Sequence, residues 1–138
     1  MLVVDASFVA AAFAEETHTD FARETMDRFL GEGFRAPALI RWELASIFWK
    51  KARRGEVDTE DMDDLSRYID ALNVSHPDLP DGAAISELAG FAQQHGLSVY
   101  DAAYLALAMG CDEALATNDR GLTTAAIAAG VTVYSPFG

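Results

Sequence analysis

The sequence is poor in cysteine, in lysine and in long apolar runs. Cys111 is the single cysteine, which excludes an internal disulfide framework and is typical of a reducing compartment, so we expect a cytoplasmic protein. No apolar run approaches the roughly 20 residues that cross a bilayer. The first basic residue is Arg23, and Asp5 interrupts the first apolar stretch. That stretch therefore predicts a first strand and helix of the fold rather than a signal peptide.

The second shortage is positive charge. Ten Lys and Arg residues face 22 Asp and Glu residues, which gives a net charge of −12. Residues 1–55 are balanced, so residues 56–138 carry the whole excess. Generic nucleic-acid binding needs Lys and Arg at phosphates, and this composition argues against it. Either some acids gather around a cation or the chain meets a basic partner.

With 138 residues, 51% of them hydrophobic, the chain is expected to form a single domain over residues 1–138. Short apolar runs predict strands over 2–5, 72–75, 114–117 and 131–134, with a loop over 72–82. Ser7 is the predicted N-cap of a helix over 8–14, and Pro37 is predicted to open a helix that ends at Arg54. Further helices are predicted over 18–30, 58–72, 82–95, 99–109 and 120–129. This alternation predicts an α/β fold with a parallel sheet of four or five strands and helices on both faces.

Four acids occupy positions that such a fold can bring to one edge. Asp5 and Asp119 follow predicted strands, Asp101 lies in the first turn of a helix, and Glu43 lies among apolar neighbours in another. Each acid also has a local explanation, as a turn former, a helix cap or a half-exposed helical residue. Together, however, clustered carboxylates repel one another unless a cation neutralises them. Oxygen ligands without Cys or His favour Mg²⁺ or Mn²⁺, which can activate a water for attack on a phosphodiester.

The segments LVVDAS, RWELAS, SVYDAAYLALA and LATNDRGL resemble, in order, the four acidic motifs of PIN-domain ribonucleases, above all the VapC-type toxins. The resemblance spans essentially the whole chain. It implies a Mg²⁺-dependent endoribonuclease, the toxin of a toxin–antitoxin pair, with Asp5, Glu43, Asp101 and Asp119 as the acidic quartet. Ser7, Thr117 and Asn118 would support these acids. It also implies a homodimer and a VapB-like antitoxin that places a basic side chain among the acids.

In this hypothesis Asp5 and Asp101 are the principal metal ligands, and Glu43 or Asp119 takes the proton from the attacking water. Lys50 and Arg54 share the helix side of Glu43, at roughly 10 and 16 Å along the axis. They would contact the RNA backbone, or else form a solvated helix end that suits the dipole.

Arg41 and Arg120 flank two of the acids and would contact phosphate or simply offset the negative charge. An aspartyl phosphatase needs an Asp where Ser7 stands, and a receiver domain needs a late Lys, whereas the only lysines are Lys50 and Lys51. Both classes are excluded. A non-catalytic interaction module with the same fold remains the alternative.

Overall fold

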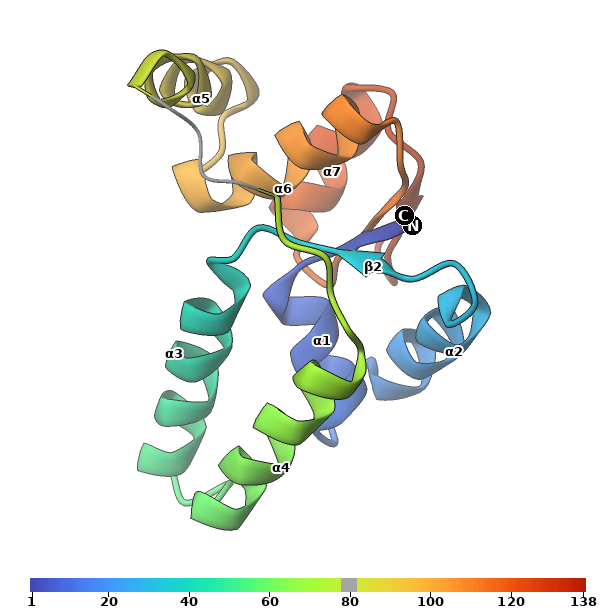
Figure 1. Ribbon diagram of the computed structural model, residues 1–138, viewed down its shortest axis with the longest axis vertical. Helices are drawn as coiled ribbons and strands as arrows, with labels where there is room; N and C mark the ends of the chain where they lie inside the picture. The colour runs from blue at the N-terminus through green and yellow to red at the C-terminus, as the bar shows by residue number, and fades with distance from the viewer. Residues whose placement is uncertain (78–81) are drawn as a thin grey trace.

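The computed structural model describes residues 1–77 and 82–138, and in this part of the chain a four-stranded parallel sheet lies between two groups of helices. The strand order is β2-β1-β3-β4. Figure 1 shows α1 to α4 on one side of the sheet and α5 to α7 on the other. The predicted α/β fold with a parallel sheet flanked on both faces is confirmed.

The strands are β1 (Leu2–Val4), β2 (Phe34–Arg35), β3 (Leu115–Ala116) and β4 (Val133–Tyr134). The helices are α1 (Ala6–Phe13), α2 (Thr19–Phe29), α3 (Ile40–Arg53), α4 (Thr59–Ala71), α5 (Gly82–His95), α6 (Val99–Cys111) and α7 (Arg120–Ala128). None of these helices is long and apolar enough to cross a bilayer.

The core lies at β1 and the elements that cover it. All three residues of β1 are fully buried, which is why the strand is uniformly apolar and does not alternate. Phe8 of α1 and Leu105 of α6, also fully buried, belong to the same apolar core. This packing fixes the ends of β1, α1 and α6 relative to one another. Two of the predicted site residues lie at those ends, Asp5 at the start of α1 and Asp101 at the start of α6.

Four local predictions need correction. Asp5, rather than Ser7, caps α1, because its carboxylate accepts the Phe8 N–H at 2.9 Å and its own backbone is extended. Pro37 does not open α3. It accepts a turn hydrogen bond from the Ile40 N–H, and the helix begins at Ile40.

The other two corrections concern strands. The sequence prediction missed β2, and the strand predicted over 72–75 is reduced to a single parallel bridge between Ser75 and Arg35. Of the loop predicted over 72–82, residues 78–81 lie outside the described residues. Asp58 caps α4 through a reciprocal capping box with Asp61.

Candidate active site

Each of the four predicted acids lies at the start of a helix. Asp5 is the N-cap of α1 and Asp119 is the N-cap of α7. Asp101 and Glu43 lie in the first turns of α6 and α3. The positive end of a helix dipole favours a carboxylate, and this is the electrostatic compensation that the fold offers them.

Asp5 is the most deeply buried of the four, with 4% of its surface exposed. Its carboxylate accepts hydrogen bonds from the Phe8 N–H, from Ser7 Oγ at 2.7 Å and from Thr117 Oγ1. These three donors lower its pKa, but desolvation outweighs them, and the charge of Asp101 adds to the rise. The pKa of Asp5 therefore rises from its ordinary value of 3.8 to about 7.

Ser7 and Thr117 join the ends of β1 and β3 through their hydroxyls. Ser7 Oγ donates to Asp5 and accepts the Asn118 N–H at 3.0 Å. Thr117 Oγ1 donates to Asp5 and accepts the Asp119 N–H at 3.0 Å. The sequence-predicted supporting residues therefore contact the first and last motifs directly.

Asp101 connects the acids electrostatically. Burial raises its pKa first, and the negative charge of Asp119 raises it further. Burial and then the charge of Asp101 also raise the pKa of Glu43, although a hydrogen bond from Tyr104 opposes the rise. Asp5, Glu43 and Asp119 thus each lie near enough to Asp101 for their negative charges to repel its charge.

The carboxylates do not form a closed metal cage. Within residues 1–77 and 82–138, no three His, Cys, Asp or Glu side chains are grouped closely enough to hold an ion. Instead, Asp5 binds its three donors and Asp119 Oδ1 accepts the Leu122 N–H at 2.7 Å. The local capping roles considered for these two acids are therefore real. Such donors stabilise carboxylates whose negative charges repel one another.

The donor set nevertheless fits a hard cation. Asp5 is a buried carboxylate, and desolvation raises its pKa despite three hydrogen-bond donors. In addition, Asn118 Oδ1 is buried with no hydrogen-bond partner in the described part of the chain. Asn118 is linked to Asp5 through its own N–H, which donates to Ser7 Oγ, while Ser7 Oγ donates to Asp5. An unpaired buried oxygen on a residue of this network is costly, and an oxygen-preferring cation would relieve that cost.

Tyr104 was not among the residues predicted from the sequence. Its ring is buried on α6, three residues after Asp101, and its Oη donates to Glu43 Oε1 at 2.6 Å. Burial, the hydrogen bond to Glu43 and the nearby carboxylate charges all raise the pKa of this phenol. The spacing of three residues on one helix face was the signal that could have revealed it.

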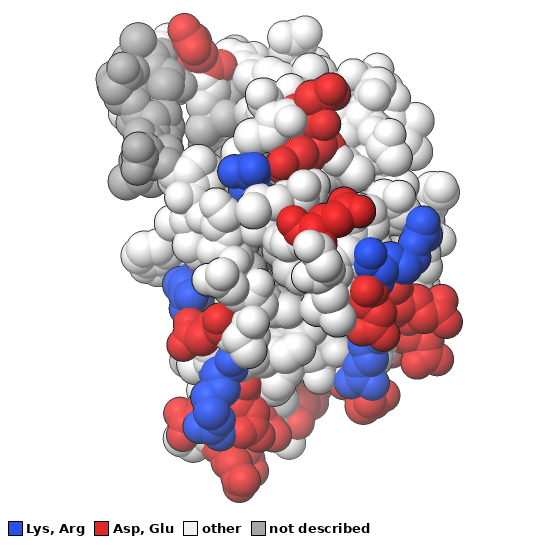
Figure 2. All heavy atoms as spheres, turned by 45° about the vertical axis from the view of Figure 1, so that its right-hand side comes forward, with Lys and Arg blue, Asp and Glu red and all other residues white. Residues whose placement is uncertain are grey.

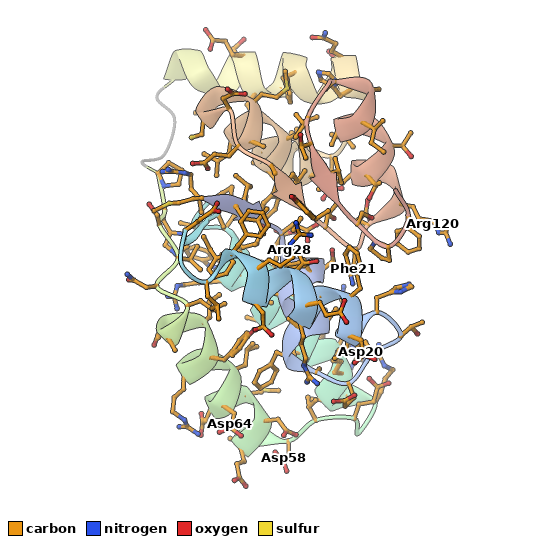
Figure 3. The ribbon with its side chains drawn as sticks, turned by 90° about the vertical axis from the view of Figure 1, so that its right-hand side faces the viewer. Asp20, Phe21, Arg28, Asp58, Asp64 and Arg120 are labelled. Atoms are coloured by element: carbon orange, nitrogen blue, oxygen red, sulfur yellow. The ribbon has the colours of Figure 1, made fainter. Side chains whose placement is uncertain are left out.

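The predicted basic contacts are dispersed. Arg41 pairs with Asp70 at 2.9 Å, and Arg54 pairs with Glu56 at 2.8 Å. Arg120 projects outward from α7, with its guanidinium 4.1 Å from the centroid of the Phe137 ring (Figure 3). Lys50 is exposed. On the face shown in Figure 2, basic side chains lie beside acidic ones and form no continuous basic patch.

Comparison with known proteins identifies the family to which this architecture belongs. The family model described as "PIN domain" matches residues 2–128. The chain belongs to the PIN-domain family. This match, together with the relative Ribonuclease VapC3 described next, confirms the predicted resemblance to PIN domains of the VapC type.

Individual relatives agree with this assignment. The chain is 32% identical over 126 residues to Ribonuclease VapC3 of Pyrobaculum aerophilum, covering 88% of this chain and 91% of that protein. The crystal structure of PAE2754 from the same organism gives a TM-score of 0.72 at 25% identity, covering 96% of this chain and 83% of the other. FitAcB from Neisseria gonorrhoeae shares the fold, with a TM-score of 0.64 at 18% identity over 99% of each chain.

Proposed function

We propose that this PIN-domain protein is a metal-dependent endoribonuclease that uses Mg²⁺, with Mn²⁺ as a substitute. The observation that carries the proposal is the set of four acids at helix starts, in which Asp101 interacts with the buried Asp5, with Glu43 and with Asp119. The name of the relative Ribonuclease VapC3 supports RNA as the substrate class.

The residues divide the work as follows. Asp5 and Asp101 would hold the cation, and Asp119 and Glu43 would complete the pocket directly or through water. When bound, the cation supplies a Lewis acid for the phosphate and lowers the pKa of water. Ser7 and Thr117 keep the Asp5 carboxylate oriented, because both hydroxyls donate to it.

Proton transfer falls to a carboxylate that is not fully committed to the cation. Glu43 and Asp119 are the candidates, and the pKa of Glu43 is already raised toward the operating pH by burial. Water attacks phosphorus and the 3′-oxygen departs as a hydroxyl, which leaves a 5′-phosphate on the downstream fragment. Lys50, Arg41, Arg54 and Arg120 are candidates for contacts with the RNA backbone, although three of them must exchange a protein partner for phosphate.

The decisive experiment incubates total RNA with metal-stripped protein plus Mg²⁺, Mn²⁺ or EDTA and sequences the new 5′ ends. We expect defined cleavage with either cation and none with EDTA. Asp5→Asn and Asp101→Asn should abolish cleavage, whereas Asp63→Asn, an exposed acid on α4, should leave it unchanged. Wild-type cleavage by either site variant would end the assignment.

A non-catalytic PIN module is the second candidate, and the lack of a three-residue metal cage in the described residues favours it. Divalent-cation titration separates the two candidates. A nuclease should gain thermal stability from Mn²⁺ in a manner that needs Asp5, whereas a pure binding module should gain none.

We further propose that the chain is the toxin of a toxin–antitoxin pair, with a VapB-like antitoxin as its partner. Most of the acidic excess lies outside the site, for example at Asp58 and Asp64 on α4 (Figure 3). Such acids fit a basic partner better than a single cation. Expression without an antitoxin should arrest bacterial growth in an Asp5-dependent way, and normal growth with abundant folded protein would refute the toxin role.

A homodimer is the third part of the proposal. Trp42 and Trp49 lie seven residues apart on α3 and are 73% and 55% exposed, which is unusual for tryptophan in a monomer. Light scattering after size exclusion should give twice the chain mass of 14.9 kDa, and Trp49→Glu should shift it toward the monomer.

A further inference from the structure

Tyr104 contributes an uncharged phenol to the cluster of carboxylates. It is 1% exposed and is the largest of the fully buried side chains in the described part of the chain. It shares a face of α6 with Asp101, one turn earlier. Its hydroxyl therefore lies beside the cluster rather than in the purely apolar part of the core.

Among the described residues, the Tyr104 hydroxyl has one hydrogen-bond partner, and that partner is a predicted site residue. Tyr104 Oη donates to Glu43 Oε1 at 2.6 Å, a short bond of the kind formed between a hydroxyl and a carboxylate. Glu43 is on α3 and Tyr104 is on α6, 61 residues apart. The bond therefore connects the helix that carries Glu43 to the helix that carries Asp101.

Glu43 is otherwise weakly restrained. It is only half-buried, and among the described residues its carboxylate has no other hydrogen bond. Asp5 and Asp119, by contrast, accept hydrogen bonds from the backbone of their own helices. A glutamate with three rotatable side-chain bonds loses conformational freedom when one oxygen is fixed, and this favours one orientation of the second oxygen.

We propose that Tyr104 is a positioning residue of the acidic site, which anchors Glu43 Oε1 and leaves Oε2 as the oxygen offered to the divalent cation. This inference rests on the proposed function. It assigns no chemistry to the phenol, whose contribution is to pre-organise a ligand. Outer partners of metal ligands typically change metal affinity by about 10- to 100-fold.

The first test measures Mn²⁺ binding to metal-stripped protein by titration calorimetry. Tyr104→Phe keeps the buried ring and removes only the hydroxyl, and we expect Mn²⁺ affinity to fall about tenfold. Tyr100→Phe is the matched control, because Tyr100 lies on the same helix with 64% of its surface exposed. It should bind Mn²⁺ as the wild type does, and the metal-free melting temperatures should show that both variants are folded.

A double-mutant cycle with Glu43→Ala distinguishes positioning from general packing. If Tyr104 acts through Glu43, adding Tyr104→Phe to Glu43→Ala should change Mn²⁺ affinity by less than about twofold. An equal loss in both backgrounds, or an unchanged affinity in Tyr104→Phe alone, would overturn the inference.

A second readout needs no variant at position 104. Binding of Mn²⁺ beside Glu43 should perturb the absorption of the hydrogen-bonded phenol, so the tyrosine difference spectrum of the wild type should change with the titration. Glu43→Ala should lack that change. RNA cleavage is measured in parallel, so a wild type that neither binds Mn²⁺ nor cleaves RNA refutes the proposed function itself. A wild type that does both, with no difference signal, refutes the role of Tyr104 alone.

Discussion

Burial of Asp5 should make the metal-free protein lose stability as the pH rises. Desolvation raises the pKa of Asp5 to about 7 in the folded state, against 3.8 in an unfolded chain. The folded state therefore holds this proton more tightly. Its contribution to stability is fully present below pH 3.8 and is lost as the pH rises to about 7. A shift of roughly three units corresponds to about 4 kcal/mol, taken as an upper bound.

Asp5→Asn removes this ionisation while an amide oxygen still accepts the Phe8 N–H. Above pH 7 in EDTA we expect the variant to be more stable than the wild type by up to about 4 kcal/mol. For a chain of this length, each kcal/mol raises the melting temperature by about 3–5 °C, so the difference should reach at most about 12–20 °C. The raised pKa values of Glu43 and Asp101 leave the variant a smaller slope of the same sign.

The assay is thermal denaturation followed by circular dichroism from pH 5 to pH 8 in EDTA. Asp63→Asn, which removes an exposed carboxylate from α4, should retain the wild-type pH dependence. The reasoning fails if the wild type melts at the same temperature across this range. It also fails if Asp5→Asn follows the wild-type curve without displacement.

Three further predictions concern other residues. Asp58→Ala removes the capping box of α4 and should lower stability by about 1–2 kcal/mol in urea denaturation, with RNA cleavage unchanged. Asp119→Ser retains a capping side chain for α7, so we expect near wild-type stability but lost cleavage, whereas Asp119→Ala should lose both the cleavage and about 1 kcal/mol. Glu113→Gln leaves Arg35 partly buried without its bidentate partner, and a stability loss of about 1–3 kcal/mol is expected, measured by the same denaturation. An unchanged urea midpoint for Asp58→Ala or Glu113→Gln, or full activity for Asp119→Ser, would contradict the corresponding prediction.

The helices and the parallel sheet were predictable because their signals are local. Caps such as Asp58 and Ser98 act within one turn, and the sequence shows them directly. The second strand was not predictable for the opposite reason. Phe34 and Arg35 form a strand of two residues, one of them charged, so no apolar run marks it, and only pairing with β1 makes it a strand. The bridge at Ser75 is likewise a product of tertiary contacts.

The sequence predicted that the acids of the candidate site come together, but not the contacts that their side chains make. Motif order identified the acids, Ser7 and Thr117, and the structure brings these residues to one edge. No sequence pattern predicted that Arg41 and Arg54 form ion pairs with carboxylates. Tyr104 was missed because a tyrosine in an apolar helix face has the same pattern whether its hydroxyl meets water, a carbonyl or a carboxylate.

Helix capping and metal binding are compatible roles for the same acid. A carboxylate has two oxygens and room for several donors, so accepting one backbone N–H does not saturate it. Asp119 accepts the Leu122 N–H through Oδ1, and among the described residues no hydrogen bond engages its Oδ2. The cap also restrains a side chain whose negative charge repels that of Asp101. Helix starts are therefore suitable places for a cluster of acids. The dipole lowers the cost of each charge, and capping holds the carboxylates of Asp5 and Asp119 in position.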